Sequence, residues 1–345
     1  MSSLEGDWRV PLDSVDASLI DSFQSGVPVE PRPFQSIGAS LSISETAALD
    51  RLERLLELGI VRRFGPVLNP PVIGSSTLAA VQVPEDRFDA VAETINSYRQ
   101  VNHNYRRDHE WNMWFVLTAG TKARRDAIID EIEAVAGSVL VLPLVTDYYI
   151  NLEFPVVNGD QFAKSTHTQA TVEPTPVSET RMADLSPLEC ELLLAVQDGF
   201  PLSLTPYQDV AERIGSDVAT VVTAIETLLE TNCIKRIGCI VNHVTTGFDS
   251  NCMVVWEVPL EAIDRYGSRV GAIPYVTLCY HRPPRPEQNW PYTLFTMIHG
   301  RDSTAVDERI DELATEQLPF NHERLYSTES LKQTGARYDE LISDF

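Results

Sequence analysis

The sequence predicts an α+β protein made of two homologous halves, each with a helical segment followed by a βαββαβ segment. The first observation behind this prediction is a match between IVRRFGPVLNP (Ile60–Pro70) and IKRIGCIVNH (Ile234–His243). The second is a match between VNHNYRRDHEWNMWFVLTAG (Val101–Gly120) and VTLCYHRPPRPEQNWPYTLFTMIHG (Val276–Gly300). A repeat of this length is typical of duplicated domains and not of a solenoid.

Three helices and a strand are predicted at the start of each half, over residues 10–75 and 185–248. In the second half, Ser186–Glu189 forms a capping box with proline at the first helical position, and Gly215 ends the next helix. A stripe of apolar residues marks the third helix in both halves. Three helices followed by a strand pair indicate a winged helix-turn-helix. We expect a weak second helix in the first half, because VPVEPRPFQSIGASLS contains three prolines.

After each predicted wing, the order strand, helix, strand, strand, helix, strand indicates a ferredoxin-like domain, over residues 76–157 and 249–345. The expected elements are Thr77–Val83, Asp86–Ser97, Val101–Arg107, Trp111–Ala119, Lys122–Ala136 and Val139–Ile150 in the first half, and Asn251–Val258, Leu260–Val270, Tyr275–Arg282, Tyr292–His299, Ser303–Ala314 and Asn321–Tyr326 in the second. The hairpin match aligns Phe115 with Phe295 and gives the second half a longer tip. We expect helices on one face of each sheet and the charged hairpin motifs on its open face or at its tip.

The composition limits the classes of function. Of the 345 residues, 27 are Lys or Arg and 50 are Asp or Glu, and the resulting net charge of −23 disfavours binding to DNA. No apolar run approaches the ~18 residues of a membrane span, and MSSLEGDWRVPLDSVD has no signal-peptide pattern, so we predict a cytoplasmic protein that does not bind membranes. The five cysteines are odd in number and form no CxxC, which argues against a disulfide framework or a zinc site. Residues 158–184 are rich in Ser, Thr and Pro and are predicted to be a linker.

A winged helix followed by a ferredoxin-like sheet resembles the Lrp/AsnC regulators. The wing motifs RRFGPVLN and KRIGCIVNH and the hairpin motifs HNYRRDHEWNMWF and CYHRPPRPEQNWPYTLFTMIHG are similar to those of one branch, the siroheme (sirohaem) decarboxylases. The similarity covers nearly the whole chain, in the form in which two related subunits are fused. The chain departs from the family pattern at His281, where Arg or Gln is usual, and at Pro70, where His is usual.

This resemblance implies loss of carbon dioxide from two acetate side chains of siroheme, giving 12,18-didecarboxysiroheme in haem d1 or alternative haem biosynthesis. It implies that siroheme is the substrate and that no cofactor is required. It also implies that the two halves pair through their sheets as a pseudo-dimer. Further association with a second copy or with related decarboxylase subunits is left open.

Siroheme is a flat polyanion, so a protein that binds it needs guanidinium groups for the carboxylates and an apolar slot for the ring. The hairpins and wings carry candidates of both kinds. The predicted substrate-binding residues are Arg62, Arg63, Arg106, Arg107, His109, Trp114, Arg236, His243, Arg282, Arg285 and Trp290. The alternatives are surface ion pairs for the arginines, a remnant of DNA binding for the wing residues, and core packing for the aromatic residues.

Loss of carbon dioxide requires a proton for the ring system, which a histidine or tyrosine can deliver. The predicted catalytic pairs are His281 with Tyr280 and His103 with Tyr105. No metal site is predicted from the protein alone, and His281 or His103 is the candidate ligand of the substrate iron. We favour the second half as the active one because its hairpin tip is longer and contains Arg285. The alternative for each histidine is a structural role.

Two other functions fit parts of the sequence. An Lrp/AsnC-type transcription regulator would explain the architecture and the basic wings. However, the expected recognition helix SDVATVVTAIETLLE has no Arg, Lys, Asn or Gln, the residues on which base reading depends. A non-catalytic tetrapyrrole carrier would use the same binding residues, and only turnover would distinguish it from a decarboxylase.

Overall fold

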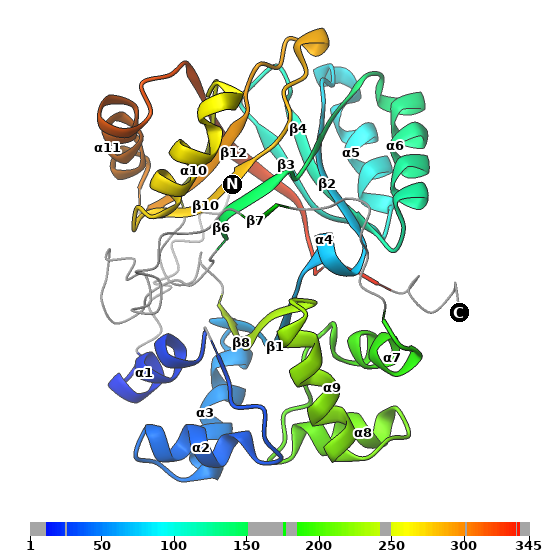
Figure 1. The fold of residues 1–345 in the computed structure, drawn as a ribbon, viewed down its shortest axis with the longest axis vertical. Coiled ribbons are helices and arrows are strands. Elements are labelled where there is room, and N and C mark those ends of the chain that lie inside the picture. Colours follow the sequence, from blue (N-terminus) through cyan, green and yellow to red (C-terminus); the bar gives the residue numbers. More distant parts are fainter. Residues whose placement is uncertain are drawn as a thin grey trace. The chain divides into compact units, whose positions relative to one another are not determined.

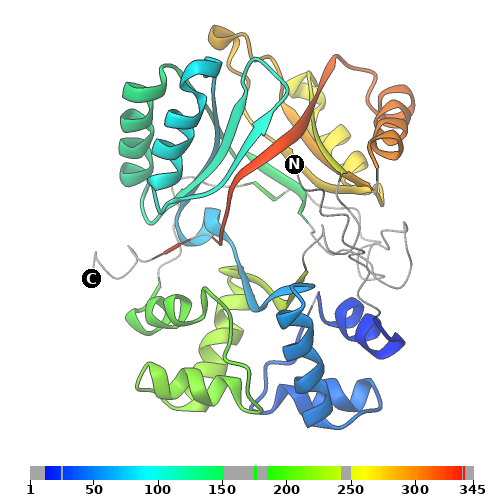
Figure 2. The ribbon, with the colours of Figure 1, turned by 180° about the vertical axis from the view of Figure 1, so that it is seen from behind.

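The computed structural model describes residues 12–24, 26–150, 175–176, 185–241, 250–300, 302–335 and 337–338. The chain forms two compact units, each of which combines segments from both halves (Figures 1 and 2). Unit 1 comprises Met1–Leu68, Glu153–Phe162 and Glu191–Asp249, and unit 2 comprises Asn69–Leu152, Ala163–Cys190 and Ser250–Phe345. The predicted linker 158–184 lies outside the described residues except for β7 (Thr175–Pro176), and the exact domain boundaries stay predictions.

Both predicted three-helix segments are present. Their elements are α1 (Ser14–Phe23), α2 (Pro33–Ser40), α3 (Glu45–Glu57) and β1 (Val61–Leu68) in the first half, and α7 (Pro187–Val196), α8 (Pro206–Arg213), α9 (Val218–Glu230) and β8 (Ile234–Val241) in the second. The expectation of a weak second helix in the first half is wrong. Pro33 stands at the first helical position of α2, where its missing N–H costs no intrahelical hydrogen bond.

The predicted strand pair contains one strand from each half. Strands β1 and β8 pair antiparallel, with Gly65 opposite Gly238. Both glycines permit close backbone approach: a Cβ on Gly65 would lie 2.7 Å from the Gly199 Cα, and a Cβ on Gly238 would lie 2.5 Å from the Gln24 carbonyl oxygen. The glycine shared by the two wing motifs is therefore required by this packing.

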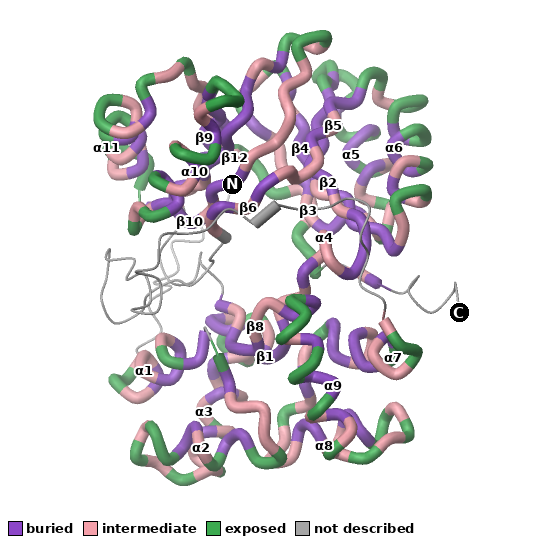
Figure 3. Tube along the Cα trace, viewed as in Figure 1, coloured by how far each residue is buried: buried purple, intermediate pink, exposed green. Residues whose placement is uncertain are grey.

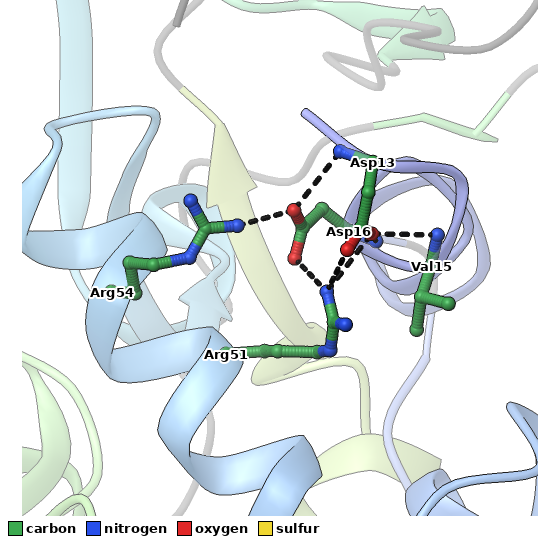
Figure 4. A network of polar contacts seen from close by, with 5 residues as sticks. All are labelled: Asp13, Val15, Asp16, Arg51 and Arg54. Atoms are coloured by element: carbon green, nitrogen blue, oxygen red, sulfur yellow. Dashed lines mark hydrogen bonds and ion pairs between the residues drawn. The ribbon is translucent and has the colours of Figure 1, made fainter. Parts of the chain in front are cut away.

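The first turn of α1 is bound to α3 by an ionic network (Figure 4). Asp13 caps α1 by accepting hydrogen bonds from the backbone N–H groups of Val15 and Asp16. Arg51 of α3 lies 2.8 Å from an Asp13 oxygen and 2.6 Å from an Asp16 oxygen, and Arg54 binds the second Asp16 oxygen. Because Asp16 is fully buried, these two guanidiniums provide its counter-charge.

Unit 2 contains both predicted ferredoxin-like domains. Their elements are β2 (Ser75–Val81), α5 (Phe88–Ser97), β3 (Val101–Arg107), β4 (Met113–Ala119), α6 (Lys122–Ala136), β5 (Val139–Pro143) and β6 (Thr146–Ile150) in the first half, and β9 (Ser250–Trp256), α10 (Ile263–Gly271), β10 (Val276–His281), β11 (Leu294–Gly300), α11 (Ser303–Glu312) and β12 (His322–Gln333) in the second. Short helical elements are α4 (Pro70–Ile73), η1 (Glu85–Arg87), η2 (Leu260–Ala262), η3 (Pro286–Gln288) and η4 (Leu313–Gln317). No helix among the described residues is long and apolar enough to cross a membrane.

The two halves of unit 2 exchange strands. The strands are joined in the order β5-β2-β4-β3-β12-β9-β11-β10-β6-β7. We call β5-β2-β4-β3 the first sheet and β9-β11-β10-β6-β7 the second, and β12 joins them. The first part of β12, His322–Tyr326, pairs with β9 of its own half, and Ser327–Gln333 pairs with β3 of the other half. In the same way β5 pairs with β2, whereas β6 pairs with β10 of the other half. The expected sheet pairing between the halves is thus confirmed.

The expectation that each sheet has an open face is wrong. Helices α5 and α6 cover one face of the first sheet and α10 and α11 cover one face of the second, each over its own apolar core (Figures 1 and 3). The other faces of the two sheets share a third core, which we call the inter-sheet core. Its buried members are Leu78, Ala80, Trp111, Trp114, Leu140, Leu142, Met253, Val255, Tyr280, Trp290, Tyr292, Phe295 and Leu325.

Candidate functional site

Alternation along β3 sorts the first hairpin motif onto two faces. Asn104 bonds to Asn96 of α5, and Arg106 lies 2.5 Å from Glu85 and 4.3 Å above the Phe88 ring, so both face the helices. His103, Tyr105 and Arg107 face the inter-sheet core. The rings of His103 and Tyr105 stack with 6.2 Å between centroids, and the Arg107 guanidinium lies 5.8 Å from the Tyr105 ring.

Strand β10 repeats this arrangement in the second half. Tyr280 belongs to the inter-sheet core, and the Arg282 guanidinium lies 4.7 Å from its ring centroid. Cys279 belongs to the core under α10, and His281, two residues further, faces the same way. The predicted pairing of His281 with Tyr280 is therefore wrong, because adjacent residues of one strand point to opposite faces and cannot act on the same group.

His281 lies near groups that hold β6 against α10. Burial lowers the pKa of its imidazole, and the nearby carboxylate of Asp264 partly opposes this shift. The Tyr148 hydroxyl donates a hydrogen bond of 2.5 Å to the same carboxylate. The Tyr148 ring occupies the space where a Cβ on Gly267 would stand, at 2.3 Å. These contacts give His281 a helix-side environment.

Arg107 and Arg282 are anchored in equivalent ways. Arg107 donates a hydrogen bond to the carbonyl of Leu325 in β12, and Arg282 donates one to the carbonyl of Leu142 in β5. Each arginine therefore binds a backbone carbonyl of the other half, just before the segment of that half that pairs across. Arg107 is only 6% exposed, and the Nε atoms of both arginines are buried without a hydrogen-bond partner among the described residues.

The electrostatics of these two arginines are unusual. Neither forms an ion pair with a carboxylate in the part of the chain that the structure describes. Burial lowers the pKa of both guanidiniums, and the groups that oppose this shift are Cys252, Tyr280 and Tyr105 for Arg107 and Tyr280 for Arg282. A buried cation without a counter-ion is costly, so this face of unit 2 has unused capacity for an anion.

The exposure of the inter-sheet face increases along the hairpin strands. Near the tips, Trp114 and Trp290 are buried with 5.3 Å between their ring centroids. The next residues toward the other end are half-buried: His103, Val116, Leu278 and Met297. Tyr105, opposite Trp114, is half-buried as well. His103 is opposite Val116, and Leu278 is opposite Met297. This end therefore combines apolar side chains with His103 and Tyr105. Arg107, Tyr280 and Arg282 follow on the same two strands, toward the hairpin tips.

Four other predicted binding residues have structural contacts at the tips. His109 lies 2.5 Å from Glu323, and Arg285 donates to the carbonyls of Val141 and Pro284. Trp114 and Trp290 fill the inter-sheet core. The longer second tip thus covers the edge of β5, which removes the reason for favouring the second half.

The wing arginines bind backbone within unit 1. Arg63 donates to the carbonyls of Gln197 and Pro66, and Arg236 donates to the carbonyl of Gln24. Arg62 is exposed on β1. His243 lies outside the described residues. The structure thus gives Arg63 and Arg236 a role in joining the two halves of unit 1.

The sequence interpretation missed Val116, Leu278 and Met297, which line the half-exposed end. Part of the reason is the alignment of Phe115 with Phe295, which the structure corrects. Phe115 belongs to the core under α5 and α6, whereas Phe295 is opposite Tyr280 in the inter-sheet core, as Trp114 is opposite Tyr105. Strand alternation counted from Tyr105 and Tyr280 would have found these residues.

The fold and the site define a class: a duplicated helix-turn-helix protein with paired AsnC-like domains. On the shared face of these domains, each half places one buried arginine that has no carboxylate partner in the described part of the chain. Family models agree, since residues 73–148 and 245–332 match the AsnC-like ligand binding domain. Residues 16–62 and 189–234 match the siroheme decarboxylase NirDL-like HTH domain.

Known proteins then identify the family. The siroheme decarboxylase NirDL subunit of Paracoccus denitrificans is 35% identical over 96% of this chain and 99% of its own length. The NirD subunit of Pseudomonas aeruginosa is 44% identical over 42% of this chain and 97% of its own. A crystal structure of siroheme decarboxylase NirDL in co-complex with an iron-uroporphyrin III analogue has a TM-score of 0.70 at 23% identity, and covers 96% of this chain and 95% of its own. The chain belongs to the siroheme decarboxylase family.

Proposed function

We propose that this chain decarboxylates two acetate side chains of siroheme, giving 12,18-didecarboxysiroheme in haem d1 biosynthesis. Membership of the siroheme decarboxylase family supports the reaction. The observation that carries the site is the pair Arg107 and Arg282, which extend from opposite halves to one face with no carboxylate bonded to either among the described residues. A substrate with eight carboxylates supplies the missing counter-charge.

The remaining side chains of the face match the rest of the substrate. Val116, Leu278 and Met297 offer an apolar, half-buried surface for the ring. Arg107 and Arg282 bind carboxylates that do not react and so fix the ring orientation. The reacting acetate lies against the apolar side chains, because strong stabilisation of that carboxylate would slow its loss.

His103 and Tyr105 supply the proton in this proposal. Their stacked rings share the face of Arg107, so a group held by Arg107 lies within their region of the sheet. The reaction needs no cofactor, and the iron belongs to the substrate. We further propose that the protein acts in the cytoplasm.

A transcription regulator is a weaker candidate. The arginines of the first-half recognition helix, Arg51 and Arg54, are bound to Asp13 and Asp16 of α1 (Figure 4). Base reading requires such side chains to reach the groove edges. A protein with a net charge of −23 also lacks the overall positive charge that supports binding to phosphates.

The test is anaerobic incubation of the purified chain with siroheme, followed by mass analysis of the tetrapyrrole. Loss of two molecules of carbon dioxide supports the proposal and shows that the chain suffices. Tight binding without a change in mass supports a carrier, or a catalyst that needs a related subunit. Absence of binding rejects a tetrapyrrole function.

A further inference from the structure

The two halves share their tyrosine and arginine on the inter-sheet face but differ in one ionisable side chain. Tyr105 and Arg107 of β3 correspond to Tyr280 and Arg282 of β10. Two residues before each tyrosine, toward the half-exposed end, the halves differ. The first half has His103, which is opposite Val116, and the second half has Leu278, which is opposite Met297. Both positions are half-buried, and their side chains differ in chemistry.

This difference decides which half can deliver a proton. A general acid works best when its pKa is near the operating pH, which favours imidazole over a phenol with an ordinary pKa of about 10. Leucine cannot take this role. Among the described residues, the other histidines of the second half do not replace it. His281 faces the helices, and His322 stacks on Trp256 in the core under α10 and α11. Buried His299 lies beyond the Met297 row, with its Nδ1 2.9 Å from the Thr277 Oγ1.

We infer that the chain has a single catalytic centre, in which His103 of the first half is the acid and the second half only binds substrate. This inference rests on the proposed function. In each step the bond between the methylene carbon and the carboxylate breaks, carbon dioxide leaves, and the electron pair remains with the ring system. The methylene carbon gains one proton, which His103 supplies and recovers from water. Both acetates are therefore presented to the same centre in succession.

The repeat itself provides the matched test. His103→Leu gives the first half the residue that the second half has naturally, and the double variant His103→Leu/Leu278→His moves the histidine to the second half. We expect the single variant to lose both decarboxylations, with rates lower by about 10²- to 10⁴-fold, the usual contribution of a general acid. It keeps siroheme binding in an anaerobic absorbance titration. The double variant recovers decarboxylation, because the new histidine at position 278 precedes Tyr280 and Arg282 on its strand as His103 precedes Tyr105 and Arg107.

Several results would overturn the inference. Loss of one carbon dioxide from the His103→Leu variant at the wild-type rate would show that the second half has its own centre. Loss of both would show that a tyrosine is the acid. An inactive double variant that binds siroheme and unfolds at the wild-type temperature would show that the halves differ by more than this side chain. His103→Gln tests the same loss if the leucine variant does not fold. A wild-type chain that binds siroheme without turnover contradicts the proposed function instead.

Discussion

Replacing Arg107 by methionine separates a binding role from a structural one. The substitution removes a buried guanidinium that donates a hydrogen bond to the Leu325 carbonyl and has no carboxylate partner among the described residues. Loss of that hydrogen bond costs about 1–3 kcal/mol, whereas removal of a buried charge without a counter-ion relieves a desolvation penalty of several kcal/mol, which slightly exceeds this cost. We therefore expect the free energy of unfolding without ligand to rise slightly, by about 1 kcal/mol. That change raises Tm by roughly 2–4 °C for a domain of this size.

Siroheme affinity changes in the opposite direction. The Nε atom of Arg107 has no partner within the described ranges, so on the proposed function the variant loses at least one charged hydrogen bond to a substrate carboxylate. Such a bond contributes about 1.5–3 kcal/mol, which corresponds to a Kd higher by roughly 10- to 150-fold. Thermal unfolding without ligand and an anaerobic absorbance titration with siroheme measure the two effects on the same preparation.

Arg285→Met is the matched control. Arg285 donates to the carbonyls of Val141 and Pro284 at the hairpin tip, so its loss lowers Tm and leaves siroheme affinity unchanged. The opposite pattern for Arg107→Met, a Tm several degrees lower with the Kd unaltered, would refute the reasoning. Arg107 would then be an anchor for β12 and not a carboxylate ligand.

Three further predictions concern the framework. Asp16→Asn removes the buried carboxylate between the two arginines of α3. We expect a loss of about 1–3 kcal/mol in the free energy of unfolding of unit 1, measured by denaturant titration, because both arginines retain partial contact with water. An unchanged midpoint would show that the network is dispensable. Gly267→Ala places a Cβ 2.3 Å from the Tyr148 ring, so we expect the free energy of unfolding to fall by about 1–3 kcal/mol. The control is Gly26→Ala, because Gly26 is exposed and a Cβ there meets nothing within 4 Å. Protease cleavage within residues 158–184 leaves two fragments that co-elute in gel filtration, because β6 and β12 each pair with the other half; separate elution would contradict this.

Periodicity predicted the order of elements well but not their partners. An amphipathic pattern such as that of Phe88–Ser97 fixes which face of a helix is buried, and so most element bounds agree with the structure. The pairing partner of a strand has no such local signal. Residues 322–333 form one strand that belongs to two sheets, and nothing in their alternation reveals the change of partner.

The candidate site was predicted in part for the same reason. Arg107, Tyr105 and His103 share a face because they are two residues apart, and this follows from the sequence alone. His281 shows the opposite case, since its position next to Tyr280 already excluded a common target. The contacts of Arg285 with β5 could not be foreseen, because they join residues far apart in the chain.

The exchange of strands also determines the order in which the chain can fold. Strand β3 is synthesised early, yet its partner in β12 follows more than 200 residues later, as the register of Arg107 with Ser327 shows. Contacts between residues so far apart in sequence slow folding, because loop closure precedes any gain from the pairing. During synthesis the edge of β3 therefore stays unpaired until nearly the whole chain has left the ribosome, and unpaired edges favour aggregation. Deletion of the last strand would consequently disrupt the sheets of both halves, and the C-terminal segment completes a domain that begins near residue 70.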